Sequence, residues 1–160
     1  MRIKAQQLAL SRIYTAAKET LFENDSMPAA LTVKLDNNLE ADILGDAGID
    51  RDNITERLQE ITAAGKPKTQ LQYIVRIRPA PETASNADAI IMLTDTLIHE
   101  LVHVLTCGKD ETEHGPAFQT EAVKHGLEIV YDSSGQYANT RITPAALMIV
   151  LKQGGYVKCG

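Results

Sequence analysis

Three residues near the middle of the chain have the types and spacing of a catalytic metal site. His99, Glu100 and His103 form an H-E-x-x-H pattern. On a helix, four residues advance by about 6 Å and rotate only about 40° past a full turn, so both imidazoles point the same way. Two converging imidazoles suit a zinc ion, and the adjacent glutamate can reach water bound to that ion. The pattern therefore predicts zinc ligands at His99 and His103 and a general base at Glu100.

A catalytic zinc needs a third protein ligand and keeps one position for water. His114 lies eleven residues after His103, beyond a polar run at 108–113 that can turn the chain back. It stands just before Gly115-Pro116, a helix start, and Phe118 can anchor that start in the core. We expect His114 to be the third ligand.

Other residues near the motif have competing interpretations. Glu121 is the alternative third ligand, and His125 is more simply a cation at the C-terminus of a helix. Asp95, one helical turn before His99, is a candidate partner for an imidazole, or equally a solvated residue. Cys107 is interpreted as a small residue filling a helix end rather than as a ligand.

The elements that must carry these residues form an α+β pattern. Residues 85–106 are apolar on nearly all sides and lack Gly and Pro, which predicts a buried helix. The other predicted helices cover 5–22, 53–64, 116–125 and 143–151, and the predicted strands cover 31–35, 70–78 and 127–131. Residues 39–50 give no readable pattern.

Composition places limits on the class of protein. The chain has 160 residues, 44% hydrophobic and 23% charged, which is an ordinary globular balance. No apolar run reaches the roughly 18 residues expected of a membrane span, so we expect no membrane crossing. Two cysteines are too few for a disulfide framework, and we expect a reducing, cytoplasmic location. The net charge of −5 argues against wholesale nucleic-acid binding.

The H-E-x-x-H pattern followed by His114-Gly115-Pro116-x-Phe118 resembles the SprT-like metallopeptidase family, which includes the Spartan proteases. The close match covers about residues 90–120. The resemblance implies a zincin-like domain over residues 1–160, with the H-E-x-x-H helix packed on a small sheet and His114 completing a zinc site. It also implies protein substrates, which in Spartan-type members are proteins crosslinked to DNA.

Two regions depart from the family pattern. Residues 36–70 do not resemble the region before the catalytic helix, and the helix predicted at 53–64 reads as an insertion. Residues 156–160 look like the opening of a C-terminal zinc ribbon, yet Cys159 alone cannot build a four-ligand site. We therefore expect one zinc ion rather than two.

The sequence therefore predicts a zinc metalloendopeptidase that acts on protein or peptide substrates. DNA-associated proteins are candidate substrates. Candidate donors to the oxyanion are Tyr131, Tyr137 and Arg141. A second enzymatic interpretation is a regulatory peptidase of the ImmA type, which cleaves a repressor and uses a glutamate as third ligand. A third is a binding module with a structural zinc closed by a fourth protein ligand, for which Glu111, Glu113 and Cys107 are candidates.

Overall fold

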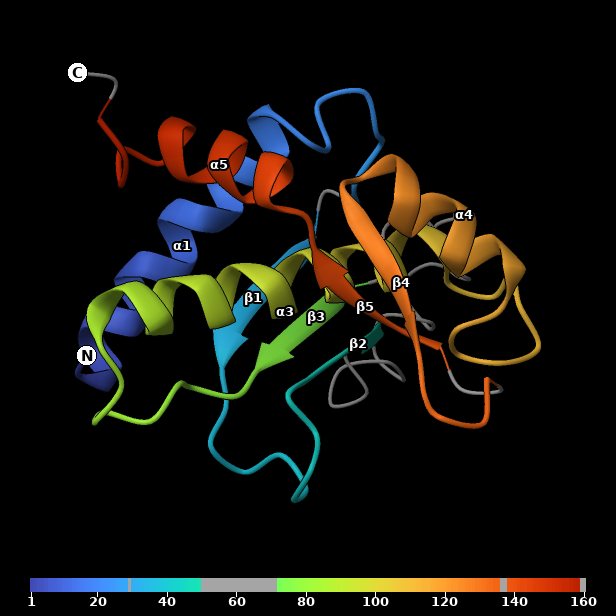
Figure 1. Cartoon of the computed structure of the whole chain (residues 1–160), viewed down its shortest axis with the longest axis horizontal. Coiled ribbons are helices and arrows are strands. Elements are labelled where there is room, and N and C mark those ends of the chain that lie inside the picture. The colour runs from blue at the N-terminus through green and yellow to red at the C-terminus, as the bar shows by residue number, and fades with distance from the viewer. Residues whose placement is uncertain (29, 50–71, 136–137, 159–160) are drawn as a thin grey trace, which may run out of the picture.

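The computed structural model describes residues 1–28, 30–49, 72–135 and 138–158. The helix predicted at 53–64 lies outside these described residues. Within them the fold is α+β, as the sequence predicted, with a mixed sheet, a separate strand hairpin and helices packed on both (Figure 1).

The sheet has the order β1-β3-β2. Strand β1 (Leu31–Leu35) runs parallel to β3 (Tyr73–Ile77), and β2 (Gly45–Ile49) runs antiparallel to β3 from its other side. Among the described strands β2 is therefore an edge strand. It was not predicted, because its sequence Gly-Asp-Ala-Gly-Ile lacks the β-branched alternation typical of strands.

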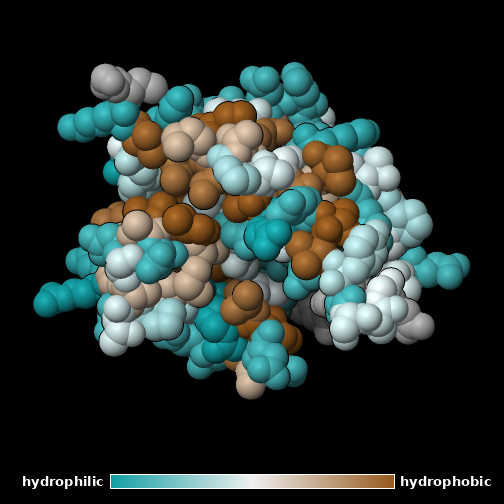
Figure 2. Space-filling model, viewed as in Figure 1, coloured by the Kyte–Doolittle hydropathy of each residue, from teal (hydrophilic) through white to brown (hydrophobic). Residues whose placement is uncertain are grey.

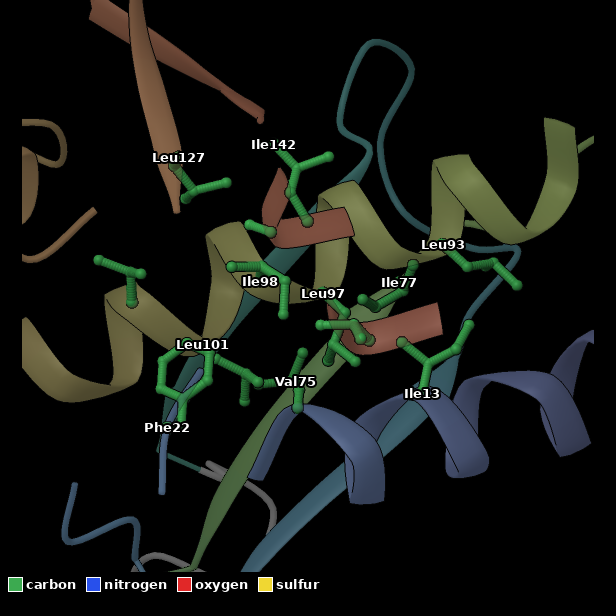
Figure 3. Packing of buried hydrophobic residues seen from close by; sticks show 14 of the residues in the cluster. Ile13, Phe22, Val75, Ile77, Leu93, Leu97, Ile98, Leu101, Leu127 and Ile142 are labelled. Carbon is green, nitrogen blue, oxygen red and sulfur yellow. The ribbon is translucent and has the colours of Figure 1, made fainter. Parts of the chain in front are cut away.

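Helices α1 (Ile3–Glu19) and α3 (Asn86–Thr106) pack on the sheet and on each other. α3 begins after Ser85, whose hydroxyl accepts from the Asp88 N–H at 3.1 Å. Figure 3 shows apolar side chains of both helices meeting those of β3 in one core, and the labelled residues are at most 7% exposed. This packing explains the apolar circumference of α3: it faces α1, the sheet and the C-terminal elements together.

The C-terminal part of the chain covers the other side of α3. Helix α4 (Pro116–Lys124) leads into a hairpin of β4 (Leu127–Tyr131) and β5 (Ala138–Ile142), and α5 (Pro144–Gln153) returns to α1. Gly126 joins α4 to β4 with φ +87°, and a Cβ there would lie 2.3 Å from the Ala146 Cβ. Glycine is therefore required at this turn. β5 was not predicted.

α3 is also long and apolar enough to cross a membrane by length and composition, with a mean hydropathy of 1.4 over its best window. The sequence-based expectation of no membrane crossing, which rested on the absence of an apolar run of about 18 residues, is neither confirmed nor contradicted by this helix. The finding is weak evidence for a span, because the core helix of a folded domain meets the same criterion and 56% of this window is buried. Figure 2 shows apolar side chains at several places on one face of the molecule. The exposed large apolar residues include Ile91 and Met92 on α3 as well as Met148 and Ile149 on α5.

Candidate metal centre

The structure brings three imidazoles to one point. The Nε2 atoms of His99 and His103, one turn apart on α3, lie 3.1 Å from each other. His114, on the segment that returns from α3 to α4, places its Nε2 atom 3.2 Å from that of His99. The three rings thus converge as the sequence predicted.

The spacing of these nitrogens fits a tetrahedral metal ion. Two ligands of a zinc ion at Zn–N distances near 2.0–2.1 Å are separated by about 3.3 Å. The observed separations from His99 are 3.1 and 3.2 Å, and the ligand atoms of all three residues lie within 4.8 Å of one another. Three imidazole nitrogens gathered this closely could hold a metal ion between them.

The environment keeps two of these rings in the neutral form that a metal requires. Burial lowers the pKa of His99 to about 3, with further contributions from His103 and His114. Burial also lowers the pKa of His103 to about 4, assisted by His114. Both imidazoles therefore present an unprotonated nitrogen at neutral pH.

Phe118 forms the floor of the cluster. It is 1% exposed, and its ring centroid lies 4.3 Å from that of His103, 4.8 Å from that of His114 and 5.1 Å from that of His99. The sequence predicted this residue as an anchor for the α4 start. The structure adds that the same ring packs against all three imidazoles and limits their rotation.

Two side chains that the sequence did not suggest position His114. The Asp110 carboxylate accepts from the N–H groups of Ala117 at 2.9 Å and Phe118 at 2.8 Å, capping the first turn of α4. The Gln119 side-chain amide donates to the His114 carbonyl oxygen at 2.8 Å. Together they hold the end of the α3–α4 loop against the helix.

A third unpredicted residue orients His99. The Nδ1 atom of His99 lies 2.6 Å from the Thr140 hydroxyl oxygen, so the ring nitrogen opposite the cluster has a fixed partner. Asp95, expected to contact an imidazole, instead accepts from the Ile142 N–H at 2.7 Å. It therefore ties β5, and with it Thr140, to α3.

Glu100 lies beside the imidazoles and is only 5% exposed. Its carboxylate has no hydrogen bond or ion pair with any described residue. Burial raises its pKa to about 8, and the charges of Asp46 and Glu113 add to the rise. Strand β2 packs closely here, since a Cβ on Gly45 would lie 3.0 Å from the Glu100 Cγ and 2.8 Å from the Thr96 Cγ2.

The cluster opens into a cleft of about 560 Å³. Its walls are the loop and strand at 42–47, the loop at 106–114, and β5 at Asn139 and Thr140, with His99, Glu100 and His103 between them. A cavity of this size suits a small ligand or a few residues of a peptide.

The two predicted oxyanion donors that the structure describes, Tyr131 and Arg141, do not line this cleft. Tyr131 donates to the Gln119 side chain at 3.3 Å, and Arg141 pairs with Glu128 at 2.6 Å; neither lines the cleft. Tyr137 lies outside the described residues. Asn139 does line the cleft and carries an amide.

Glu121 and His125 belong to a second cluster. The His125 ring is 4% exposed and stacks on Phe22 at 4.4 Å, with Nε2 2.6 Å from the Asp25 carboxylate and Nδ1 2.6 Å from the Glu121 carbonyl oxygen. His125 ends α4 as predicted, but it also ties that helix to the segment after α1. Glu121 therefore lies in this second cluster and not with the three imidazoles. This placement argues against Glu121 as the third ligand.

Comparisons of the chain with known protein families, with curated proteins and with solved structures found no match. Function must therefore be inferred from the motif and from the geometry described above.

Proposed function

We propose that this chain is a zinc-dependent metallopeptidase of the SprT-like type. The observation that carries the proposal is the convergence of His99, His103 and His114 beside a buried glutamate, at the base of an open cleft. These are the ligand set and the neighbouring acid of a catalytic zinc site rather than of a general cation site.

The composition of the cluster favours a catalytic over a structural metal. Structural zinc sites are closed by four protein ligands, whereas catalytic sites keep a position open. Among the described residues, no Cys, Asp or Glu joins the three histidines as a ligand. Cys107 and Glu113 line the same cleft without joining the group. This argues against the binding module with a structural zinc.

When bound, zinc supplies a Lewis acid that lowers the pKa of water toward about 7 and polarises a carbonyl group. Glu100 then accepts a proton from the attacking water, and a C–O bond forms at the scissile carbon. Glu100 delivers that proton to the amine nitrogen as the C–N bond breaks. The pKa of about 8 describes the metal-free site; a nearby dication favours the carboxylate form that accepts the proton. We assign the Asn139 amide as the donor to the carbonyl oxygen.

The edge strand supports a polypeptide as substrate. β2 pairs only with β3 among the described strands, and residues 42–47 form one wall of the cleft. An extended peptide can pair with such an edge through main-chain hydrogen bonds. This would lay a peptide bond across the cleft beside Glu100.

The resemblance to Spartan-type members extends the proposal to proteins associated with DNA, and a salt series tests that part separately. Binding of the chain to duplex DNA that weakens steeply with salt would support it, because electrostatic DNA complexes release counterions. No binding at low salt would exclude a DNA-directed role for the chain alone.

The central experiment is elemental analysis of the purified protein together with turnover of an unfolded protein substrate. We expect one zinc per chain and measurable cleavage. Glu100→Gln should keep the zinc and lose activity by about 100-fold or more, since it removes a general base. Retained activity in that variant would overturn the mechanism, and absence of bound metal in the wild-type protein would overturn the proposal.

A further inference from the structure

The cleft has a strongly one-sided charge. Seven carboxylate residues line it, whereas no described Lys or Arg does. A cleft lined by one sign of charge concentrates ligands of the opposite sign and repels those of the same sign. The charge of the substrate that this cleft prefers should therefore depend on which of these carboxylates have no partner within the fold.

Three of the seven are occupied by the fold itself. Asp46 is paired with Arg76, with an Nε–Oδ1 distance of 2.8 Å. Asp95 accepts from the N–H of β5, and Asp110 caps α4. A fourth, Glu100, is the proposed base; it is 5% exposed, lines the cleft, and has no hydrogen-bond or ion-pair partner among the described residues.

The remaining three are Asp42, Glu111 and Glu113. All are exposed, and none makes a hydrogen bond or ion pair with a described residue. They stand on different walls: Asp42 precedes β2, while Glu111 and Glu113 lie on the loop between α3 and α4. Their placement brackets the three imidazoles with negative charge that no described part of the fold neutralises.

We infer that this cleft selects polypeptide segments with Lys or Arg beside the scissile bond, held by Asp42, Glu111 and Glu113. The inference rests on the proposed peptidase function. A cation on an extended peptide paired with β2 meets these carboxylates, whereas an acidic side chain or a phosphate meets repulsion. The same charges keep a DNA backbone out of the cleft, so any DNA contact must use another face.

The test uses three peptides that are identical except for Lys, Gln or Glu at the positions flanking one cleavable bond. We expect kcat/KM to fall in the order Lys, Gln, Glu, and the gap between Lys and Glu to narrow as salt rises, because salt screens exposed charges. Equal turnover of the three peptides would overturn the inference while leaving the peptidase proposal intact. If neither the three peptides nor an unfolded protein is cleaved, both this inference and the peptidase proposal would be overturned.

Variants locate the effect. Glu111→Gln with Glu113→Gln should lower kcat/KM for the Lys peptide by about three- to tenfold, as expected for two exposed ion pairs, and so narrow the advantage of the Lys peptide over the Gln peptide in the same variant. Glu23→Gln is the matched control, because Glu23 is exposed and does not line the cleft. A double variant that keeps the full preference for Lys, or a Glu23 variant that loses it, would contradict the assignment.

Discussion

The Thr140 hydroxyl oxygen lies 2.6 Å from the His99 Nδ1 atom, across 41 residues of sequence. For His99 Nε2 to bind a metal, the hydrogen of the neutral ring must sit on Nδ1, where Thr140 accepts it. The contact between β5 and α3 therefore fixes the orientation of the His99 ring and is compatible with the tautomer that metal binding through Nε2 needs.

Removing this hydroxyl should weaken metal binding. We expect Thr140→Val to lower zinc affinity by about 10- to 100-fold, the usual effect of losing an outer partner of a ligating histidine. Thr140→Ser keeps the oxygen and should restore most of the affinity. A competition titration with a zinc chelator measures both variants, and an unchanged affinity in the valine variant would show that the contact does not orient the ring.

The identity of the third ligand separates the SprT-like from the ImmA-type interpretation. We expect His114→Ala to lower zinc affinity more than Thr140→Val does, because it removes a proposed ligand rather than the partner of one. Glu121→Ala should leave zinc affinity unchanged, since the Glu121 carboxylate lies near Lys124 and His125 rather than at the cluster. The opposite pattern in the same chelator titration would favour a glutamate ligand.

The close contact between Gly45 and Glu100 predicts a selective loss of catalysis. In Gly45→Ala the new Cβ would meet the side chains of Thr96 and Glu100 at 2.8 and 3.0 Å. We expect kcat to fall at least tenfold while zinc stays bound, and stability to fall by about 1–3 kcal/mol from overpacking.

Gly48→Ala is the control on the same strand, because nothing lies within 4 Å of its added Cβ. Equal effects of the two substitutions on kcat would mean that β2 backbone freedom, rather than contact with Glu100, is responsible.

The second cluster should stabilise the fold without binding the functional metal. His125→Ala removes a buried ring that contacts Phe22, Asp25 and the end of α4. We expect a loss of about 2–4 kcal/mol in the free energy of unfolding, typical of a buried aromatic with two hydrogen bonds. Urea unfolding measures this loss. The zinc content should remain one per chain, and a wild-type content of two that drops to one in this variant would reveal a second metal site.

The sequence was most informative where the chemistry is local. The spacing of His99 and His103 on a helix, and the helix start after His114, depend only on neighbouring residues, and the structure brings these histidines together as expected. Helix ends were predicted to within a few residues, as α1 and α5 illustrate: α1 ends at Glu19 rather than residue 22, and α5 at Gln153 rather than 151.

The missed elements are those that tertiary pairing creates. β2 contains two glycines and β5 reads Ala-Asn-Thr-Arg-Ile, so neither has a strand pattern of its own. Each is a strand because of its partner, β3 or β4. These strands carry two of the parts of the site that the sequence did not suggest: the wall beside Glu100 and the Thr140 hydroxyl. No local pattern could show that residue 140 lies beside residue 99.

The raised pKa of Glu100 predicts an unusual pH dependence of stability in the metal-free protein. Its pKa is about 8 in the folded state against 4.5 as the ordinary value, so the folded state binds the proton more tightly. Stability from this group is complete below about pH 4.5 and is lost as the pH rises toward 8. His99 and His103, with lowered pKa values of about 3 and 4, act in the opposite sense below about pH 6.5.

Above pH 6.5 the two histidines no longer contribute to the change of the free energy of unfolding with pH, and Glu100 should dominate that change. With chelator present, the wild-type protein should lose roughly 2 kcal/mol relative to Glu100→Gln between pH 6 and pH 8, since a shifted group contributes at most about 1.4 kcal/mol per pH unit. Urea unfolding of both proteins at pH 6, 7 and 8 measures the difference. Adding zinc should abolish it, because a dication beside Glu100 stabilises the carboxylate. Parallel curves in chelator would mean that the Glu100 carboxyl is better solvated than its 5% exposure indicates.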